Sequence, residues 1–287
     1  MKKLVLLIAF ALIATVPLAQ AAPSNSDSIA RPVKVKLALV YLEDFSASGQ
    51  PTGPPGSYWY FVNSILPSQD TWQEFIPGDG YARINVDSLT SNDTDTTNPY
   101  QLLGWGGVGV GHRIAVRMKG AVVPGLTGFI FTYQEESSTF DEIDIELVAD
   151  DTATAPSGHA TLPPSGWTDA RFNSYGNSSL STYLPETSIK QPLVNADGVP
   201  VSHIDDAFHV YVIDWYANHI DFWVDSVKQA TITSPIPDSV SEVLIGFRDL
   251  SWAGAFNWSG TKTMTIDWMQ IERLPTSGSA PPPPSGS

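Results

Sequence analysis

The sequence predicts an all-β protein, an antiparallel β-sandwich of the jelly-roll type, on three observations. Short runs of β-branched and aromatic residues recur along the chain with turn residues between them. No segment carries an apolar helical stripe over three turns, and strands do not alternate with helices. The 22 glycines and 23 prolines among 287 residues supply many turns. We therefore expect two curved sheets packed face to face, with one concave polar face open as a cleft.

The predicted strands follow from period-two alternation of apolar side chains. In chain order they cover residues 33–41, 114–119, 129–133, 143–148, 208–215, 220–224, 243–247 and 264–274. Residues 208–215 and 220–224 alternate on both sides of a short break at 216–218, which predicts a hairpin.

The two ends of the chain are not expected to belong to the fold. Lys2 and Lys3 precede an apolar run over residues 4–18, and small residues follow it, so residues 1–21 are predicted to be a cleaved secretory signal. A membrane anchor is disfavoured because a span needs about 18–20 apolar residues. Residues 275–287, rich in proline, serine and glycine, are predicted to be a tail or linker. Residues 22–274 then form one domain of an exported protein, extracellular or periplasmic.

Composition excludes several classes of partner and chemistry. The chain has 30 acidic and 15 basic residues, a formal charge of −15, which disfavours nucleic acid and anionic membrane surfaces as partners. Without cysteine there is no disulfide, thiolate zinc site, iron–sulfur cluster or cysteine nucleophile.

Two further kinds of site have little support. The five histidines, His112, His159, His203, His209 and His219, show no metal-binding spacing, so a catalytic metal is not expected. Gly104, Gly106 and Gly109 satisfy the Gly-x-Gly-x-x-Gly pattern, but a predicted strand follows them where a dinucleotide site needs a helix. We interpret this segment as a glycine-rich loop.

The strongest chemical signal is a ladder of three carboxylates. In the predicted strand over residues 143–148 and the residues before it, Glu142, Asp144 and Glu146 share one face while the alternate side chains enter the core. Neighbouring carboxyl groups on that face are only about 6.6 Å apart along the backbone, so they raise one another's proton affinity.

The ladder has a structural and a catalytic interpretation. A solvated strand face in an acidic chain can carry three carboxylates without any function. Glycoside hydrolysis, however, requires two carboxyl groups in different protonation states, which such a ladder supplies. Glu142 and Glu146 are about 13 Å apart at Cα by strand rise, and long side chains can close to about 5.5 Å, the retaining geometry. Strand rise alone leaves the longer inverting separation open.

At this point the chain resembles glycoside hydrolase family 16, a family of jelly-roll enzymes. Glu142-Ile143-Asp144-Ile145-Glu146 is similar to the family's unbulged Glu-x-Asp-x-Glu signature, as in lichenases and xyloglucan transglycosylases. The resemblance covers most of residues 80–274, including 114–119, 128–133, 171–175, 208–225 and 266–268.

The resemblance implies a retaining endo-β-glycosidase. Glu142 would be the nucleophile, Glu146 the general acid and then base, and Asp144 the residue that adjusts the proton affinity of the nucleophile. The expected substrate is a β-1,3 or mixed β-1,3-1,4 glucan. The alternatives are a transglycosylase, a hydrolase of charged galactans, and a noncatalytic carbohydrate-binding sandwich.

Candidate substrate-binding residues surround the ladder in sequence. They are Arg117, Phe140, Arg171, Asn173, Tyr175, Arg248 and Trp252. Ala115 stands where lichenases usually carry a glutamate, and Phe140 where a tryptophan is common. The arginines either contact sulfate or carboxylate groups of a substrate, or pair with the acidic residues of the protein; we favour the second interpretation.

The tryptophans divide into two groups. Trp215, Trp223 and Trp268 are in predicted strands and are expected to pack, whereas Trp105, Trp167, Trp252 and Trp258 are in predicted loops and are candidates for stacking on sugar rings.

The resemblance requires no cofactor for catalysis, but it implies a structural calcium in the lichenase branch, for which Asp267 matches one ligand. We expect a monomer whose partner is a polysaccharide or oligosaccharide.

Overall fold

The structure, a computed structural model, describes residues 37–53, 58–63, 72–87, 100–120, 126–148, 168–203, 206–249, 253 and 259–275. The predicted signal over residues 1–21 and nearly all of the predicted tail lie outside these ranges. Among the described residues, no helix has the length and apolarity that a membrane crossing requires.

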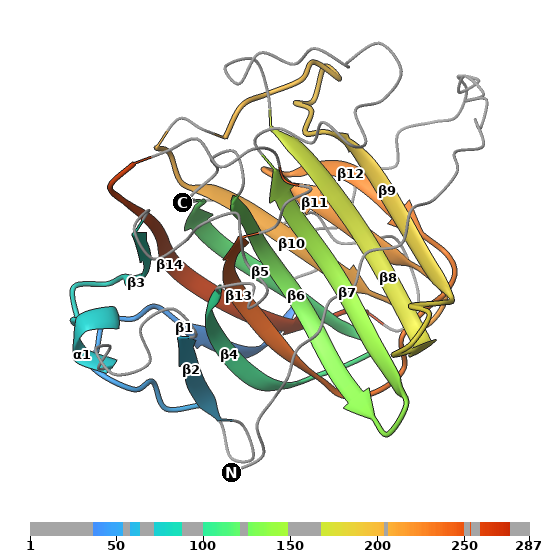
Figure 1. Ribbon diagram of the computed structural model, residues 1–287, viewed down its shortest axis with the longest axis horizontal. Coiled ribbons are helices and arrows are strands. Elements are labelled where there is room, and N and C mark those ends of the chain that lie inside the picture. The colour runs from blue at the N-terminus through green and yellow to red at the C-terminus, as the bar shows by residue number, and fades with distance from the viewer. Residues whose placement is uncertain are drawn as a thin grey trace.

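The described strands form two antiparallel seven-stranded sheets, as the sequence predicted (Figure 1). Sheet A has the order β1-β14-β5-β10-β11-β12, and β3 also pairs with β14. Its strands are β1 (Ala38–Glu43), β3 (Ala82–Asp87), β5 (His112–Lys119), β10 (His209–Trp215), β11 (Ile220–Val224), β12 (Val227–Ile232) and β14 (Thr261–Arg273). The predicted hairpin is confirmed, because β10 pairs with β11 from Tyr211↔Val224 to Trp215↔Ile220.

Sheet B has the order β2-β4-β13-β6-β7-β8-β9 and lies in front of sheet A in Figure 1. Its strands are β2 (Trp59–Asn63), β4 (Tyr100–Val108), β6 (Leu126–Glu136), β7 (Thr139–Val148), β8 (Asp169–Ser179), β9 (Glu186–Pro192) and β13 (Ser241–Asp249). A single helical turn, α1 (Trp72–Phe75), lies at the edge of the molecule beside β3.

The core fills the space between the two sheets. From β7, Ile143, Ile145 and Leu147 enter it, and each is fully buried. The rings of Phe172 on β8 and Phe222 on β11 meet with their centroids 5.1 Å apart, so this contact joins sheet B to sheet A. Burying each side chain of this size contributes about 1.5–3 kcal/mol. Strict alternation therefore leaves the intervening residues of every strand on the outer faces of the sandwich.

The segment predicted to be a glycine-rich loop is mostly a strand. Gly104 and Gly106 lie within β4, which pairs with β13 on one side and with β2 on the other. Gly104 is directly opposite Tyr60 of β2, and a Cβ atom at Gly104 would come within 2.2 Å of the ring of Tyr60. The glycine is needed because an aromatic ring lies across the strand.

Candidate active site

The three carboxylates of the predicted ladder lie on the outer face of sheet B, at the middle of β7. Glu142, Asp144 and Glu146 alternate with the buried residues that enter the core. Pairing with β8 runs without a register shift from Glu142↔Tyr175 to Val148↔Asp169. The signature is therefore unbulged, and its three side chains point the same way, as the sequence indicated.

Two of these carboxyl groups are removed from water, and burial raises the pKa of both. The exposed fraction is 6 % for Glu142 and 3 % for Asp144. Burial raises the pKa of Glu142 to about 8; the charge of Glu146 raises it further, while a hydrogen bond from Asp144 and the charge of Arg248 lower it. Burial first, and the charge of Glu142 second, raise the pKa of Asp144 well above its usual range. Because the hydrogen bond raises the pKa of Asp144 and lowers that of Glu142, Asp144 is the protonated donor.

The third carboxylate, Glu146, is held by a chain of hydrogen bonds from two neighbouring strands. The side-chain amide of Asn173 on β8 donates to Oε2 of Glu146 at 2.9 Å. The hydroxyl of Ser188 on β9 donates to the amide oxygen of Asn173 at 2.6 Å, which fixes the orientation of the amide. Glu146 is more exposed than the other two carboxyl groups. It is therefore oriented and still accessible, as a group that exchanges protons with a substrate must be.

A bulge immediately before the ladder is anchored by a residue that we did not predict, Asp141. The register of β7 against β8 shifts between Phe140 and Glu142. The carboxylate of Asp141 accepts hydrogen bonds from the backbone N–H of Asn177 at 2.5 Å and of Ser239 at 3.0 Å. It thereby ties β7 to the bend in β8 and to the segment before β13. The acidic residue next to Glu142 in sequence is a structural anchor for the strand that carries it.

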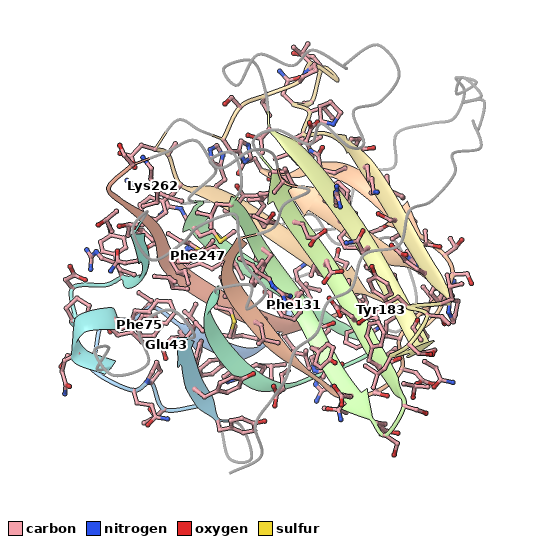
Figure 2. The ribbon with its side chains drawn as sticks, viewed as in Figure 1. Glu43, Phe75, Phe131, Tyr183, Phe247 and Lys262 are labelled. Atoms are coloured by element: carbon pink, nitrogen blue, oxygen red, sulfur yellow. The ribbon has the colours of Figure 1, made fainter. Side chains whose placement is uncertain are left out.

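An aromatic cluster covers sheet B beside Glu142. It contains Phe129, Phe131, Tyr133, Phe140 and Leu244, with Tyr60, Tyr175, Leu180 and Tyr183 packed against it. Phe131 and Tyr183 are labelled in Figure 2.

The structure does not support Phe140 as a surface for stacking on sugar, because its ring is 3 % exposed. Tyr133, Tyr175 and Tyr183 surround it with centroids 5.2–6.0 Å away. Tyr175 and Tyr183, which are partly exposed, are the rings that remain accessible.

Asn173, Tyr175, Arg171 and Arg248 lie where the sequence predicted, around the ladder. Asn173 and Arg171 are directly opposite Asp144 and Glu146 in the pairing of β7 with β8. Arg248 lies on β13, and its charge lowers the pKa of Glu142. Both arginines are buried, with exposed fractions of 5 % for Arg171 and 2 % for Arg248. The interpretation that the arginines pair with acidic residues of the protein stays a prediction for these two.

The prediction that Arg117 binds substrate is wrong. Arg117 is on β5 in sheet A, on the face that points away from the core and from sheet B. There its guanidinium pairs with Asp267 and lies 4.6 Å from the centre of the Phe208 ring. The sequence pattern suggested that residues 114–119 lie beside the carboxylate ladder. However, β5 belongs to the opposite sheet, and alternation along it turns Ala115 and Arg117 to the far side of the molecule.

The same ion pair argues against Asp267 as a calcium ligand. A carboxylate in direct contact with a guanidinium has its charge already compensated, and the arginine offers no oxygen to a cation. The described residues around Asp267 do not fit a calcium ion, and nothing in the proposed mechanism depends on one.

The tryptophans of the predicted loops are only partly described. Trp105 is in β4, is 2 % exposed and stacks on Tyr41 with centroids 5.3 Å apart, so its prediction as a loop residue that binds sugar is wrong. Trp252, Trp167 and Trp258 lie outside the described residues. Trp215 is fully buried, as predicted for a strand tryptophan.

A second group on the outer face of sheet B was missed from the sequence. Tyr58 and Tyr60 at the β2 edge both donate hydrogen bonds to the carboxylate of Glu242 on β13. Their rings stack with centroids 5.8 Å apart over Gly104 and Gly106 of β4. The glycines were visible in the sequence, but the tyrosines that lie over them come from a segment that matched no family pattern.

The chain was then compared with known proteins. A family model described as Glycosyl hydrolases family 16 matches residues 108–270, more than half of the chain. A β-glucanase of Paenibacillus polymyxa is 27 % identical over 203 residues, which cover 67 % of this chain and 70 % of that protein. A β-glucanase of Bacillus amyloliquefaciens is 27 % identical over 164 residues, covering 55 % of this chain and 57 % of that protein.

Solved structures show the same fold. A prokaryotic β-1,3-1,4-glucanase (lichenase) from a mouse hindgut metagenome superposes with a TM-score of 0.55 at 19 % identity, covering 82 % of this chain and 99 % of that chain. The catalytic domain of an endo-1,3-β-glucanase (laminarinase) from Thermotoga petrophila gives a TM-score of 0.56 at 16 % identity, covering 83 % and 98 %.

Proposed function

This chain belongs to glycosyl hydrolases family 16, and from that premise we propose that it is an exported endo-hydrolase of a β-1,3 or mixed β-1,3-1,4 glucan that acts with retention. The observation that carries the proposal is the buried pair of Glu142 and Asp144 beside an accessible, hydrogen-bonded Glu146. Export is proposed from residues 1–21 alone.

The reaction uses two of the three carboxyl groups, Glu142 and Glu146. Glu146 donates its proton to the glycosidic oxygen while the Glu142 carboxylate attacks the anomeric carbon, and the leaving sugar departs with a new hydroxyl group. A covalent glycosyl ester on Glu142 remains. Glu146, now a carboxylate, takes a proton from water, whose oxygen displaces Glu142 and restores both groups.

Three further residues, Asp144, Asn173 and Arg248, assist these steps through hydrogen bonds and charge. Asp144 keeps its proton and donates a hydrogen bond to Glu142, which stabilises the carboxylate that must attack and later leave. Asn173 orients the oxygen of Glu146. Arg248 lowers the pKa of Glu142 and so favours its charged form.

A neutral glucan is the substrate that these residues support. Arg171 and Arg248 are buried and Arg117 lies on the opposite sheet, so none of the three presents a guanidinium to a sulfated or uronic chain. The relatives named above are β-glucanases.

A noncatalytic binding role is disfavoured because the carboxylate ladder lowers the stability of the fold. Two buried carboxyl groups with raised pKa values weaken the fold at neutral pH, and a binding surface has no use for them.

The test is the release of reducing ends from a panel of polysaccharides. The panel contains mixed-linkage β-glucan, laminarin, xyloglucan, agarose and carrageenan, each with and without added oligosaccharide acceptors. We expect hydrolysis of the first two, and no measurable turnover by Glu142→Gln or Glu146→Gln, which should fold normally. Greater activity on the galactans, agarose or the sulfated carrageenan, or product elongation that dominates hydrolysis, would replace the proposal with one of its rivals.

A further inference from the structure

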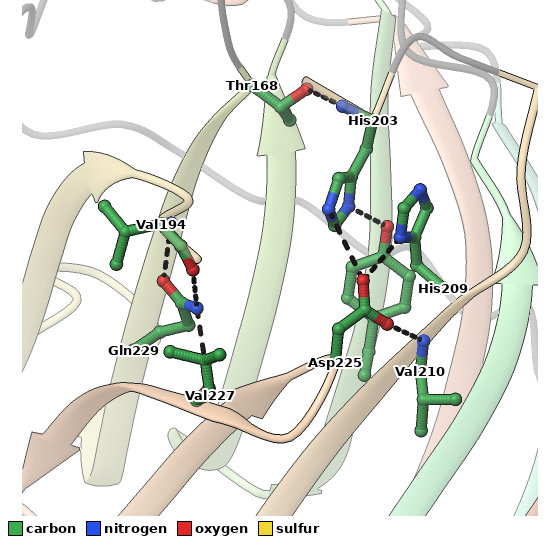
Figure 3. Close-up of polar contacts among 9 residues, drawn as sticks. Thr168, Val194, His203, His209, Val210, Asp225, Val227 and Gln229 are labelled. Carbon is green, nitrogen blue, oxygen red and sulfur yellow. Dashed lines mark hydrogen bonds and ion pairs between the residues drawn. The ribbon is translucent and has the colours of Figure 1, made fainter. Parts of the chain in front are cut away.

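Away from the carboxylate ladder, three side chains that can bind metal converge at one end of sheet A. His203 follows the β9 segment, His209 is the first residue of β10, and Asp225 lies in the turn between β11 and β12 (Figure 3). One ligand atom from each residue, a ring nitrogen or a carboxylate oxygen, lies within 4.8 Å of the other two. The two histidines do not have a metal-binding spacing in the sequence and meet only through the fold.

The distances fit a small transition-metal ion. Nδ1 of His209 is 2.6 Å from Oδ2 of Asp225, and Nε2 of His203 is 3.9 Å from the same oxygen. Ligand atoms around a tetrahedral zinc ion lie about 3.4 Å apart, given bonds of about 2.0–2.2 Å. The distances of 2.6 Å and 3.9 Å to Oδ2 of Asp225 lie on either side of this value.

Two of the three ligands, His203 and Asp225, are oriented by a contact through their other polar atom. Nδ1 of His203 is 2.7 Å from the hydroxyl of Tyr211, which leaves Nε2 facing Asp225. Oδ1 of Asp225 accepts a hydrogen bond from the backbone N–H of Val210 at 2.9 Å, which leaves Oδ2 facing the histidines. The backbone N–H of His203 donates to Thr168. Such outer contacts are typical of metal-binding histidines and carboxylates.

The electrostatics of the cluster also call for a cation. The imidazole rings of His203 and His209 are parallel within 5°, with centroids 3.5 Å apart, and one nitrogen of each ring faces the carboxylate of Asp225. Two imidazoles and one carboxylate are donor groups that a divalent transition-metal ion prefers. One bound cation would neutralise the carboxylate while both rings stay neutral.

The cluster opens into a pocket of about 510 Å³ that can admit the ion and its water. Val194, Val201, Val224 and Val227 form its apolar wall, and Asn195 and Ser202 lie at its polar side. A fourth coordination position can therefore be filled by solvent or by a small ligand.

We propose that His203, His209 and Asp225 bind one divalent transition-metal ion, zinc by preference, with two imidazole nitrogens, one carboxylate oxygen and a fourth position open to the pocket. Two nitrogens and one oxygen suit zinc and exclude a tight calcium or magnesium site, which requires more oxygen ligands. A metal ion bound to an imidazole nitrogen lies in the plane of that ring, and two parallel planes share no point, so binding must tilt the rings out of their parallel stack. The ion would link the segment before His203 to the β10, β11 and β12 strands.

The test is metal binding by the full chain, purified without a histidine tag and stripped with chelator. Calorimetric titration with zinc should show one equivalent bound with a micromolar or lower dissociation constant, and no comparable binding of calcium. His203→Gln, His209→Gln and Asp225→Asn should each weaken zinc binding at least tenfold. His219→Gln is the matched control, since His219 faces a carboxylate, Asp221, at 3.7 Å but has no second histidine.

A second measurement guards against variants that fail to fold. Cobalt bound to the wild-type chain should give visible absorption of tetrahedral intensity, competed away by zinc, and zinc should raise the Tm of wild type but not of the folded variants. Absence of saturable zinc binding would show that a proton, not a metal, bridges the cluster. Zinc binding that persists in both histidine variants would place the metal elsewhere.

Discussion

Asp144 donates a hydrogen bond to Glu142 from two residues along the same face of β7, and both side chains are shielded from solvent. The pair keeps a proton next to the carboxylate that is proposed to attack the sugar. Burial raises the pKa of Glu142, and the hydrogen bond from the protonated Asp144 lowers it again in part. Raising the pH should therefore favour the ionised, reactive form of Glu142 while it lowers the stability of the folded protein.

The acid limb of the pH profile should reflect the buried nucleophile. Glu142 attacks only when ionised, and its pKa is raised to about 8, chiefly by burial. We expect kcat/KM to rise with pH through a limb well above that of an ordinary glutamate, about 4.3. Initial rates on a soluble β-glucan across pH 4 to 10 measure it. A limb at or below the ordinary value would show that the free protein already holds Glu142 ionised.

The variant Glu142→Gln should stabilise the protein in alkaline solution. A carboxyl group whose folded pKa is raised is stabilising below its unfolded pKa, and that contribution is lost as pH rises through the folded pKa of about 8. The neutral amide avoids this loss, so the Tm of the variant should exceed that of wild type by about 2–8 °C at pH 8. The difference should shrink near pH 4. A lower Tm at pH 8 would show that the amide loses contacts worth more than the charge.

The support of Glu146 by Asn173 and Ser188 should appear in kcat more than in KM. Asn173→Ala removes the amide that orients Glu146, and we expect kcat to fall about 10–100-fold, less than the roughly 100–10,000-fold that a general acid or base itself contributes. Ser188→Ala, which only frees the amide to rotate, should have a smaller effect in the same direction. Steady-state kinetics on one soluble glucan compare the two. Equal losses in KM with kcat intact would make Asn173 a substrate ligand.

Gly104 should tolerate no side chain while Tyr60 is in place. A Cβ atom would come within 2.2 Å of the tyrosine ring, so Gly104→Ala should cost about 1–3 kcal/mol in the free energy of unfolding. Gly109→Ala is the control, because its Cβ atom would meet Val240 at an ordinary 3.8 Å. In a Tyr60→Ala background the cost at Gly104 should largely disappear. Denaturant unfolding of the four variants decides, and additive losses would show that the ring is not the obstacle.

The ion pair of Arg113 and Asp214 should matter far more than a surface pair. Their charged atoms are 2.6 Å apart and both side chains are about 1 % exposed or less. Arg113→Ala leaves a buried carboxylate without its partner and should cost about 3–5 kcal/mol. Arg83→Ala, at an exposed pair with Asp79, should cost less than about 1 kcal/mol. Comparable losses in unfolding experiments would show that burial does not govern these pairs.

Period-two alternation was enough to predict the sandwich and the direction of the ladder. Glu142 and Glu146 face one way because side chains alternate in every strand, whatever the rest of the fold does. The hairpin of β10 and β11 was equally local. In contrast, β2 and β9 were not predicted from the sequence. Tyr58, Tyr60 and Glu186 are placed by their neighbours on other strands, which no local pattern shows.

The errors have one physical cause, which is that spacing along a strand does not say to which sheet the strand belongs. Arg117 alternates correctly but lies in sheet A, far from the ladder. Trp105 is flanked by glycines that indicate a loop, yet those glycines make room for tyrosine rings in a strand. His203 and His209 carry no metal-binding spacing because they meet across a bend and a strand start. Long-range pairing, absent from any local pattern, decides all three.

Mass spectrometry of a trapped intermediate would show whether Glu142 forms a covalent bond to the sugar. The wild-type chain would be incubated with an activated 2-deoxy-2-fluoro β-glucosyl oligosaccharide, digested and mapped. We expect one sugar ester, on the peptide containing Glu142 and on that residue, and none in Glu142→Gln. An ester on Glu146 or another residue, or active hydrolysis of glucan without any trapped ester, would contradict this prediction.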